Sequence, residues 1–221
     1  MKSIVGLITV VVVMVSSGVA SAQTRAPASG QDKDRGYIEG VAQSAFGNVT
    51  SQSYGVEFGY TIRRDLQVFG EVGRIRDVAD STFSGDAATI ATALSQVQPA
   101  AVAVTAKRPV TFFGGGIKYR PPSTLAVQPY VMGGFGFGNV DNDVTFTLGG
   151  AVASASTLAQ YVTLGSDLSG SSTNAMLTLG GGAMVPLWRT LLLDLQYRYG
   201  RIFSDEGINT NRAGVGFGVR F

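Results

Sequence analysis

Large apolar residues alternate with small or polar residues along most of the chain after Arg35. Residues 53–60 show the pattern most clearly, with Tyr54, Val56, Phe58 and Tyr60 on one face against Ser53, Gly55, Glu57 and Gly59 on the other. Successive side chains of a β-strand point to opposite faces, so this period of two predicts a strand. The pattern repeats seven more times, at residues 37–46, 66–73, 111–119, 127–137, 177–185, 191–199 and 212–221. We therefore expect eight strands.

The connections between these segments alternate in length. Tight turns are expected at residues 62–65, 121–124 and 188–190, whereas the connections at 77–106 and 139–172 are long. Short turns at one end and long loops at the other are typical of outer-membrane barrels. The prediction for residues 35–221 is an all-β fold, an eight-stranded antiparallel transmembrane up-and-down β-barrel with short periplasmic turns and two long extracellular loops.

A soluble β-barrel would show the same alternation, but its bulky apolar face would point inward and its polar face would meet water. The composition helps to separate the two. Only 14% of the residues are charged, 45% are hydrophobic and 30 are glycine, whereas soluble domains carry about 25% charged residues. Glycine on the face opposite the bulky residues suits a narrow interior better than a solvated surface. This favours the membrane barrel.

The N-terminus has the three parts of a secretory signal peptide. Lys2 precedes an apolar run at residues 4–15, and the sequence Ala20-Ser21-Ala22 matches a cleavage site. A membrane anchor is the alternative, but the run is shorter than the roughly 17–25 residues that a spanning helix needs. Residues 1–22 are thus expected to direct Sec-dependent export, and the polar residues 23–34 to form a flexible leader. Without Lys2 the chain carries 16 basic and 15 acidic residues, so its net charge indicates no partner.

Three segments resemble the small outer-membrane β-barrel proteins of Gram-negative bacteria, the OmpA/OmpX/Opa-like group. They are the opening GYIEGVAQSAFG, the central PYVMGGFGFG and the closing AGVGFGVRF. The resemblance implies a location in the outer membrane, in contact with its lipid. It also implies that the last strand is the signal for the barrel-assembly machinery, through Val215, Phe217, Val219 and Phe221.

The alternation places eight charged residues on the inner face: Glu39, Glu57, Glu71, Lys118, Asp194, Arg198, Arg212 and Arg220. The interior of an eight-stranded barrel is just wide enough for side chains to fill it. Isolated charges there would be very unfavourable, so we expect the four acids and four bases to pair in a polar plug. Glu57, Glu71, Arg198 and Arg212 are expected at its centre, and a proton relay or ion path is the alternative.

Aromatic residues fall near the predicted strand ends, at Tyr54, Tyr60, Tyr119, Trp188, Tyr197 and Tyr199. Outer-membrane barrels carry aromatic girdles at both membrane interfaces. The competing interpretation is a set of core aromatics in a soluble fold. We expect the girdles.

The residue types restrict the chemistry. The chain has no His and no Cys, which removes imidazole-activated nucleophiles, thiolates and the usual zinc and haem ligands. We therefore expect no enzyme, no metal and no cofactor. The glycines at 134–138 lie within a predicted strand rather than before a helix, so a phosphate-binding loop is not indicated. No basic patch suggests nucleic acid.

Function on a common scaffold usually lies in its loops. Residues 82–106 and 149–172 form long segments that are poor in charge. Asp86 is the one charged residue of the first segment, and Asp167 is the one charged residue of the second. They are expected to extend the strands, to form short helices over the mouth, or to present an apolar surface to an extracellular ligand or host surface. The leading hypothesis is a structural, adhesin-like protein. The alternative is a narrow pore or transporter for small or apolar solutes, gated by the long loops.

Overall fold

The computed structural model describes residues 35–124, 126–158, 161 and 169–221. The predicted signal peptide at 1–22 and leader at 23–34 lie outside the described residues, so both remain predictions. Among the described residues, no helix has the length and apolar character needed to cross a membrane.

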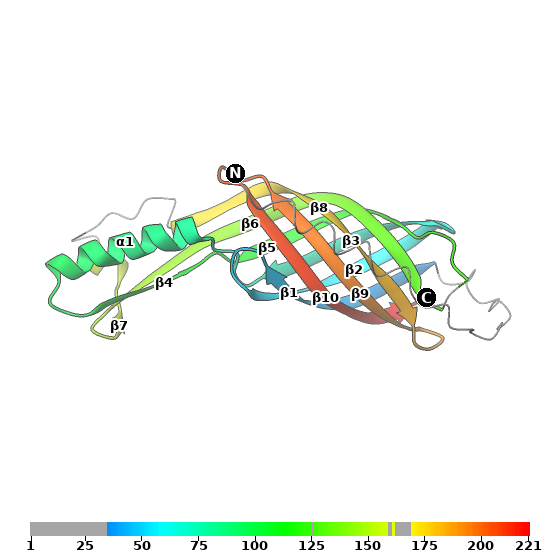
Figure 1. Ribbon diagram of the computed structural model, residues 1–221, viewed down its shortest axis with the longest axis horizontal. Helices are drawn as coiled ribbons and strands as arrows, with labels where there is room; N and C mark the ends of the chain where they lie inside the picture. Colours follow the sequence, from blue (N-terminus) through cyan, green and yellow to red (C-terminus); the bar gives the residue numbers. More distant parts are fainter. Residues whose placement is uncertain (1–34, 125, 159–160, 162–168) are drawn as a thin grey trace, which may run out of the picture.

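Eight antiparallel strands close into a ring, which confirms the predicted all-β barrel (Figure 1). They are β1 (Gly36–Phe46), β2 (Ser51–Arg63), β3 (Leu66–Ile75), β5 (Val110–Tyr119), β6 (Gln128–Leu148), β8 (Ser169–Pro186), β9 (Leu191–Ile202) and β10 (Ile208–Arg220). Each strand pairs with its neighbours in the ring, and β1 pairs with β10 to close it. The up-and-down order follows the chain.

Each wall of the barrel has the two faces that the alternation predicts. On β2 the glutamate Glu57 is fully buried in the lumen, while its neighbour Phe58 is 59% exposed on the outside. Phe135 on β6 is 71% exposed. The bulky apolar face therefore points outward and the polar face inward, the reverse of a soluble barrel and the arrangement that a lipid environment requires.

The ends of the barrel differ. The turn end holds the connections 64–65, 120–127 and 187–190, together with the start of β1 and the end of β10. The loop end holds the connections 47–50 and 203–207 and the two long insertions. The prediction of a tight turn at 121–124 is wrong in length, because β5 ends at Tyr119 and β6 begins only at Gln128.

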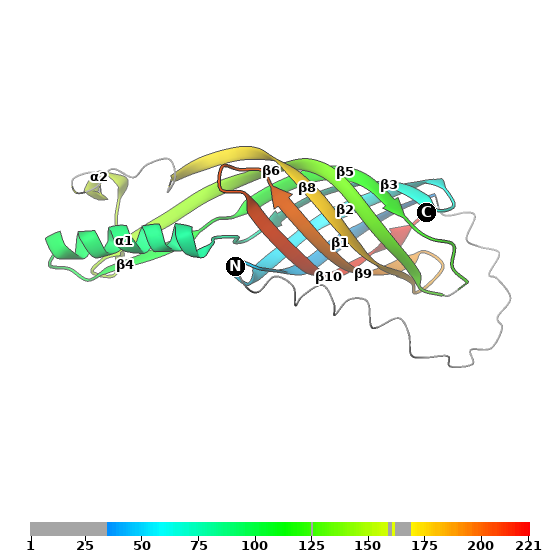
Figure 2. The same cartoon turned by 45° about the horizontal axis from the view of Figure 1, so that its top comes forward.

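The long insertions build a second structure beyond the loop end, which we call the extension (Figure 2). Residues 139–148 and 169–172, expected to be loop, continue β6 and β8. The short strands β4 (Val102–Lys107) and β7 (Ala151–Val152) pair with this part of β6. Helix α1 (Ser81–Val97) lies along the sheet and points away from the barrel rather than over its mouth, and α2 (Ala155–Leu158) is a single turn.

Helix α1 forms because its buried side chains recur at helical spacing. Asp80 caps its N-terminus, accepting a hydrogen bond from Phe83 N at 2.8 Å. Phe83, Ala87, Ala91 and Leu94 are buried, three or four residues apart, on one face of the helix. Ala91 and Leu94 pack on the sheet around Phe146, and Phe83 packs near Ala106 and Val144. The apolar character of residues 82–106 thus comes from a helix with its own small core.

A buried arginine joins the extension to the rim of the barrel. The Arg108 guanidinium lies 4.2 Å from the centre of the Phe83 ring and donates to Asn142 Oδ1 and Glu206 Oε2, both at 2.9 Å. The Asp77 carboxylate accepts from the backbone N of Ala79 and Arg108, at 2.9 and 3.0 Å. These contacts hold the first turn of α1 beside the short connection between β9 and β10.

Glycine lines the inner face of β5 and β6, where Gly114 pairs with Gly136 and Gly116 with Gly134. A Cβ atom at Gly136 would collide with the Phe113 carbonyl and the Gly114 Cα of the neighbouring strand. The two strands therefore approach each other with no room for a side chain on this wall, which leaves space for large side chains from the opposite wall.

The close approach predicts that Gly136→Ala lowers the free energy of unfolding by about 1–3 kcal/mol, because the added methyl group overpacks rigid backbone. Equilibrium urea unfolding of the refolded protein in lipid vesicles, followed by the fluorescence of Trp188, measures the effect. The matched control is Gly40→Ala on the outer face of β1, where nothing lies within 4 Å of a new Cβ. Equal destabilisation by the two variants would contradict the steric explanation.

Candidate functional site

The lumen contains three layers of side chains, which can be followed along β9. Its inward residues run from Leu192 near the turn end through Asp194 and Arg198 to Ile202 near the loop end. The lower apolar layer consists of Tyr37, Phe69, Tyr130, Met132, Met184 and Leu192. The upper apolar layer consists of Ala45, Ile75, Val78, Val110, Phe112, Val140, Met176, Ile202 and Ile208. Between them lies the charged layer, formed by Glu57, Glu71, Lys118, Asp194, Arg198 and Arg212.

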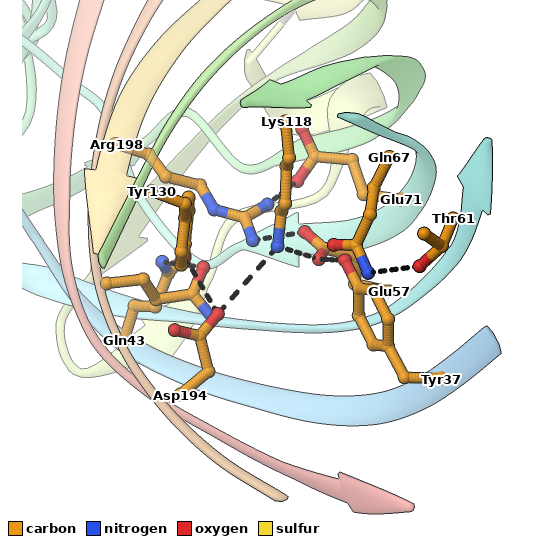
Figure 3. Close-up of polar contacts among 11 residues, drawn as sticks. Tyr37, Gln43, Glu57, Thr61, Gln67, Glu71, Lys118, Tyr130, Asp194 and Arg198 are labelled. Atoms are coloured by element: carbon orange, nitrogen blue, oxygen red, sulfur yellow. Dashed lines mark hydrogen bonds and ion pairs between the residues drawn. The ribbon is translucent and has the colours of Figure 1, made fainter. Parts of the chain in front are cut away.

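Glu57 is the centre of the charged layer (Figure 3). One carboxylate oxygen, Oε1, accepts hydrogen bonds from the Tyr37 hydroxyl and the Lys118 ammonium group. The other, Oε2, accepts from Nη2 of Arg198. Because charge-assisted hydrogen bonds are the strongest in proteins, these partners offset much of the cost of burying the Glu57 charge.

Two further carboxylates extend the network on either side. Arg198 donates through Nη1 to Glu71, whose other oxygen lies 3.9 Å from Nη2 of Arg212. On the opposite side Lys118 Nζ is 3.8 Å from Asp194 Oδ2, which also accepts from the Tyr130 hydroxyl at 2.8 Å. The network therefore joins residues of β1, β2, β3, β5, β6, β9 and β10 across the whole lumen.

Aromatic rings complete the surroundings of the cations. Lys118 Nζ lies 4.4 Å from the centre of the Tyr130 ring, and Arg212 Cζ lies 4.4 Å from the centre of the Phe112 ring. Each ring belongs to one of the apolar layers, so the cations are held between carboxylates and aromatic faces. A cavity of about 10 Å³ beside Glu71, Arg198 and Arg212 has room for about one water molecule.

Six of the eight predicted lumen charges meet in this layer, and two do not. Glu39 is buried in the lumen, but neither of its carboxylate oxygens has a hydrogen-bond partner among the described residues. Arg220 lies at the turn end and donates to the Trp188 carbonyl at 2.9 Å. The expected balance of four acids and four bases is therefore wrong for the lumen, since Arg220 belongs to the rim.

Sequence reasoning missed the uncharged members of the site. Tyr37 and Tyr130 each donate a hydrogen bond to a buried carboxylate, and Gln43 Nε2 donates to Gln196 Oε1 at 3.4 Å. The signal was present, because Tyr37 shares the strand face of Glu39, and Tyr130 that of Gly134. The prediction considered only charged residues and therefore omitted both tyrosines.

The outward residues lie where the pattern puts them. Tyr60, Tyr119 and Trp188 lie near the turn end, and Tyr54, Tyr197 and Tyr199 lie nearer the loop end, as their register with β1, β3 and β10 shows. The hydroxyl groups of Tyr197 and Tyr199 each donate at 2.7 Å, to Asn211 and Asn209. Val215, Phe217, Val219 and Phe221 are all exposed on one face at the end of the chain.

The ion pairs predict that Glu57→Gln lowers the free energy of unfolding by about 3–5 kcal/mol, because Lys118 and Arg198 lose a buried counter-ion. Urea unfolding in vesicles measures the loss. The control is Asp86→Asn on the exposed face of α1, where no buried cation loses a counter-ion among the described residues and a loss below about 1 kcal/mol is expected. A Glu57→Gln effect no larger than the control would contradict the assigned role of the charged layer.

Solved structures with the same fold include two with TM-scores above 0.5. A major outer membrane protein from Thermus thermophilus matches with a TM-score of 0.54 and 14% identity, covering 84% of this chain and 99% of that one. Neisserial surface protein A (NspA) matches with a TM-score of 0.52 and 15% identity, covering 84% and 96%. The attachment invasion locus protein Ail of Yersinia pestis matches with a TM-score of 0.46 and 15% identity, covering 85% and 97%. Similarity at this level of identity shows the fold alone.

No curated protein sequence matches the chain. The model of the outer membrane protein beta-barrel domain, in contrast, matches residues 9–221, which is nearly the whole chain. That match agrees with the closed ring of eight strands, the outward apolar face and the buried charged layer. The chain belongs to the outer membrane protein beta-barrel family.

Proposed function

We propose that this outer-membrane protein is a closed barrel with a structural and surface-interaction role, adhesin-like rather than enzymatic. The observation that carries the proposal is the charged layer, packed between two apolar layers across the lumen. In the same proposal, residues 1–22 direct Sec-dependent export, and the final strand with Val215, Phe217, Val219 and Phe221 is the signal for the barrel-assembly machinery.

The extension supports the interaction role. It carries α1 and the paired parts of β4, β6, β7 and β8 beyond the loop end (Figure 2). In this proposal the loop end is the extracellular side of the barrel. The exposed face of α1 carries mostly small and hydroxyl-bearing residues, with Asp86 as its one charge. Such a surface offers hydrogen bonds and flat contact area to a ligand or host surface rather than an electrostatic attraction. The outward aromatics would serve as interface girdles that hold the barrel at a fixed depth.

The alternative is a narrow pore or transporter for small or apolar solutes, gated by the extension. The packing supports the closed barrel over this alternative. A conducting path would have to cross the upper apolar layer, where Ile75, Val110 and Ile202 are fully buried. It would then have to separate Glu57 from both of its cations. Paired charges and apolar constrictions both oppose the passage of ions.

A closed lumen predicts no steady single-channel conductance when the refolded full chain is inserted into planar bilayers. A variant in which short turns replace residues 81–105 and 144–168 should be equally silent, because the barrel and its three layers are retained. A stable conductance in the full chain would contradict the plug. Conductance that appears only in the shortened variant would instead favour a pore gated by the extension.

The surface-interaction role predicts that liposomes displaying the full chain bind to host cells or extracellular matrix, and that the shortened variant loses this binding. The reason is that the interacting surface would be removed while the barrel remains. The control is a variant in which only residues 48–49, in a short connection at the same end, are replaced by glycine and serine. Equal binding by all three proteins would assign the interaction to some other part of the chain.

A further inference from the structure

The two ends of the barrel differ in charge, although the net charge of the whole sequence is only +2. The described residues at the turn end include Asp65 as their single acidic residue and six arginines, which we call the arginine collar: Arg35, Arg63, Arg64, Arg120, Arg189 and Arg220. At the loop end and in the extension, acidic residues outnumber basic ones: Asp77, Asp80, Asp86, Asp141, Asp143, Asp205 and Glu206 against Arg74, Arg76, Lys107, Arg108 and Arg201. Charge is therefore separated along the barrel axis.

Backbone contacts show that the arginine collar is continuous. The Arg35 carbonyl accepts from Thr61 N at 2.7 Å, which places Arg35 beside the end of β2 and its Arg63. Arg120 N donates to the Asp65 carbonyl at 2.8 Å. On the other side of β1, Arg220 is in register with Tyr37, and its backbone N donates to the Thr190 carbonyl at 2.8 Å, next to Arg189. The collar thus follows the ends of β5, β3, β2, β1, β10 and β9.

Three members of the collar carry charge that the described residues do not neutralise. Arg35, Arg63 and Arg189 are exposed, and none of them forms an ion pair within the described part of the chain. Arg120 differs, because it is partly buried and donates to Gln128 and Thr61, both at 3.3 Å. Arg35, Arg63 and Arg189 are therefore both exposed and available to an anion outside the protein.

The collar lies at the depth of the membrane surface. Trp188, adjacent to Arg189 in the sequence, is 74% exposed, and Phe221, adjacent to Arg220, is 70% exposed. Tyr60 and Tyr119 are exposed on the outer face at the same end. Aromatic side chains of this kind sit at the level of the lipid headgroups. The arginines of this end are consequently placed beside headgroups and not beside acyl chains.

We propose that the arginine collar binds the phosphate groups of anionic phospholipids in the leaflet that surrounds the turn end. The planar guanidinium group matches phosphate oxygens with two parallel hydrogen bonds, and the six basic residues that the structure describes at this end are all arginine. Each basic residue near an anionic membrane surface adds to the attraction, which falls off within a Debye length. This lipid site is independent of any role of the extension, and it would fix the depth and tilt of the barrel.

The single tryptophan of the protein makes the proposal directly measurable, because Trp188 reports on the turn end alone. The full chain is refolded into phosphatidylcholine vesicles that contain a fixed fraction of phosphatidylglycerol. The acyl chains of one lipid or the other carry bromine, which quenches tryptophan at short range. Brominated phosphatidylglycerol should be enriched around Trp188 by at least about threefold over its bulk fraction. High salt should reduce the enrichment, and inorganic phosphate added to the solution should compete no more than its ionic strength explains.

The charge-neutral variant R35Q/R63Q/R189Q should lose the enrichment. The matched control R74Q/R76Q/K107Q removes the same charge at exposed positions of the loop end and should keep it. If the triple variant fails to fold, R189Q alone should still lower the enrichment measurably at the neighbouring Trp188. Equal quenching by the two brominated lipids, or an equal loss in the two triple variants, would overturn the proposal.

Discussion

The narrow lumen of an eight-stranded barrel is the constraint on which the other features depend. Large inward side chains fit only where the facing wall is small. A Cβ atom at Gly59 would collide with the Tyr37 ring, one at Gly182 with Tyr130, and one at Gly216 with the Glu39 carboxylate. The same narrowness leaves little room for water, so the residues of the charged layer are neutralised by direct contact with one another. Glycine content and ion pairing are thus two consequences of one geometric limit.

The period of two was sufficient to predict which residues of the barrel point inward. Every strand keeps the predicted faces, because one residue of slip would move bulky apolar side chains into a lumen that cannot hold them. The pattern could not predict which inward side chains pair with one another in the lumen. Arg220 has the inward phase of β10, yet it lies at the rim, and Glu39 is buried without a described hydrogen-bond partner. Depth along the axis and reach across the lumen decide the partners, and a strand pattern contains neither.

The extension could not be predicted from the pattern for a different physical reason. The strand β6 keeps its period of two beyond the membrane, but its outward residues change from Phe135 and Phe137 to Asp141 and Asp143, since they no longer meet lipid. The absence of bulky outward residues therefore marked the end of the lipid zone and not the end of the strand. In α1 two of the four buried residues, Ala87 and Ala91, are alanine. A stripe of small residues gives a weak amphipathic signal.

The lumen is closed at its centre, and the two ends of the molecule present different surfaces. At the loop end, a helix and a sheet with few charges extend outward, held to the rim through Arg108 and Asp77. At the turn end, an arc of arginines lies beside exposed aromatic residues. The net charge of only +2 does not reveal this division, because the acidic excess of one end offsets part of the basic excess of the other. A barrel with opposite charge at its two ends has an electrostatic reason to prefer one depth and one orientation in a membrane whose two faces differ.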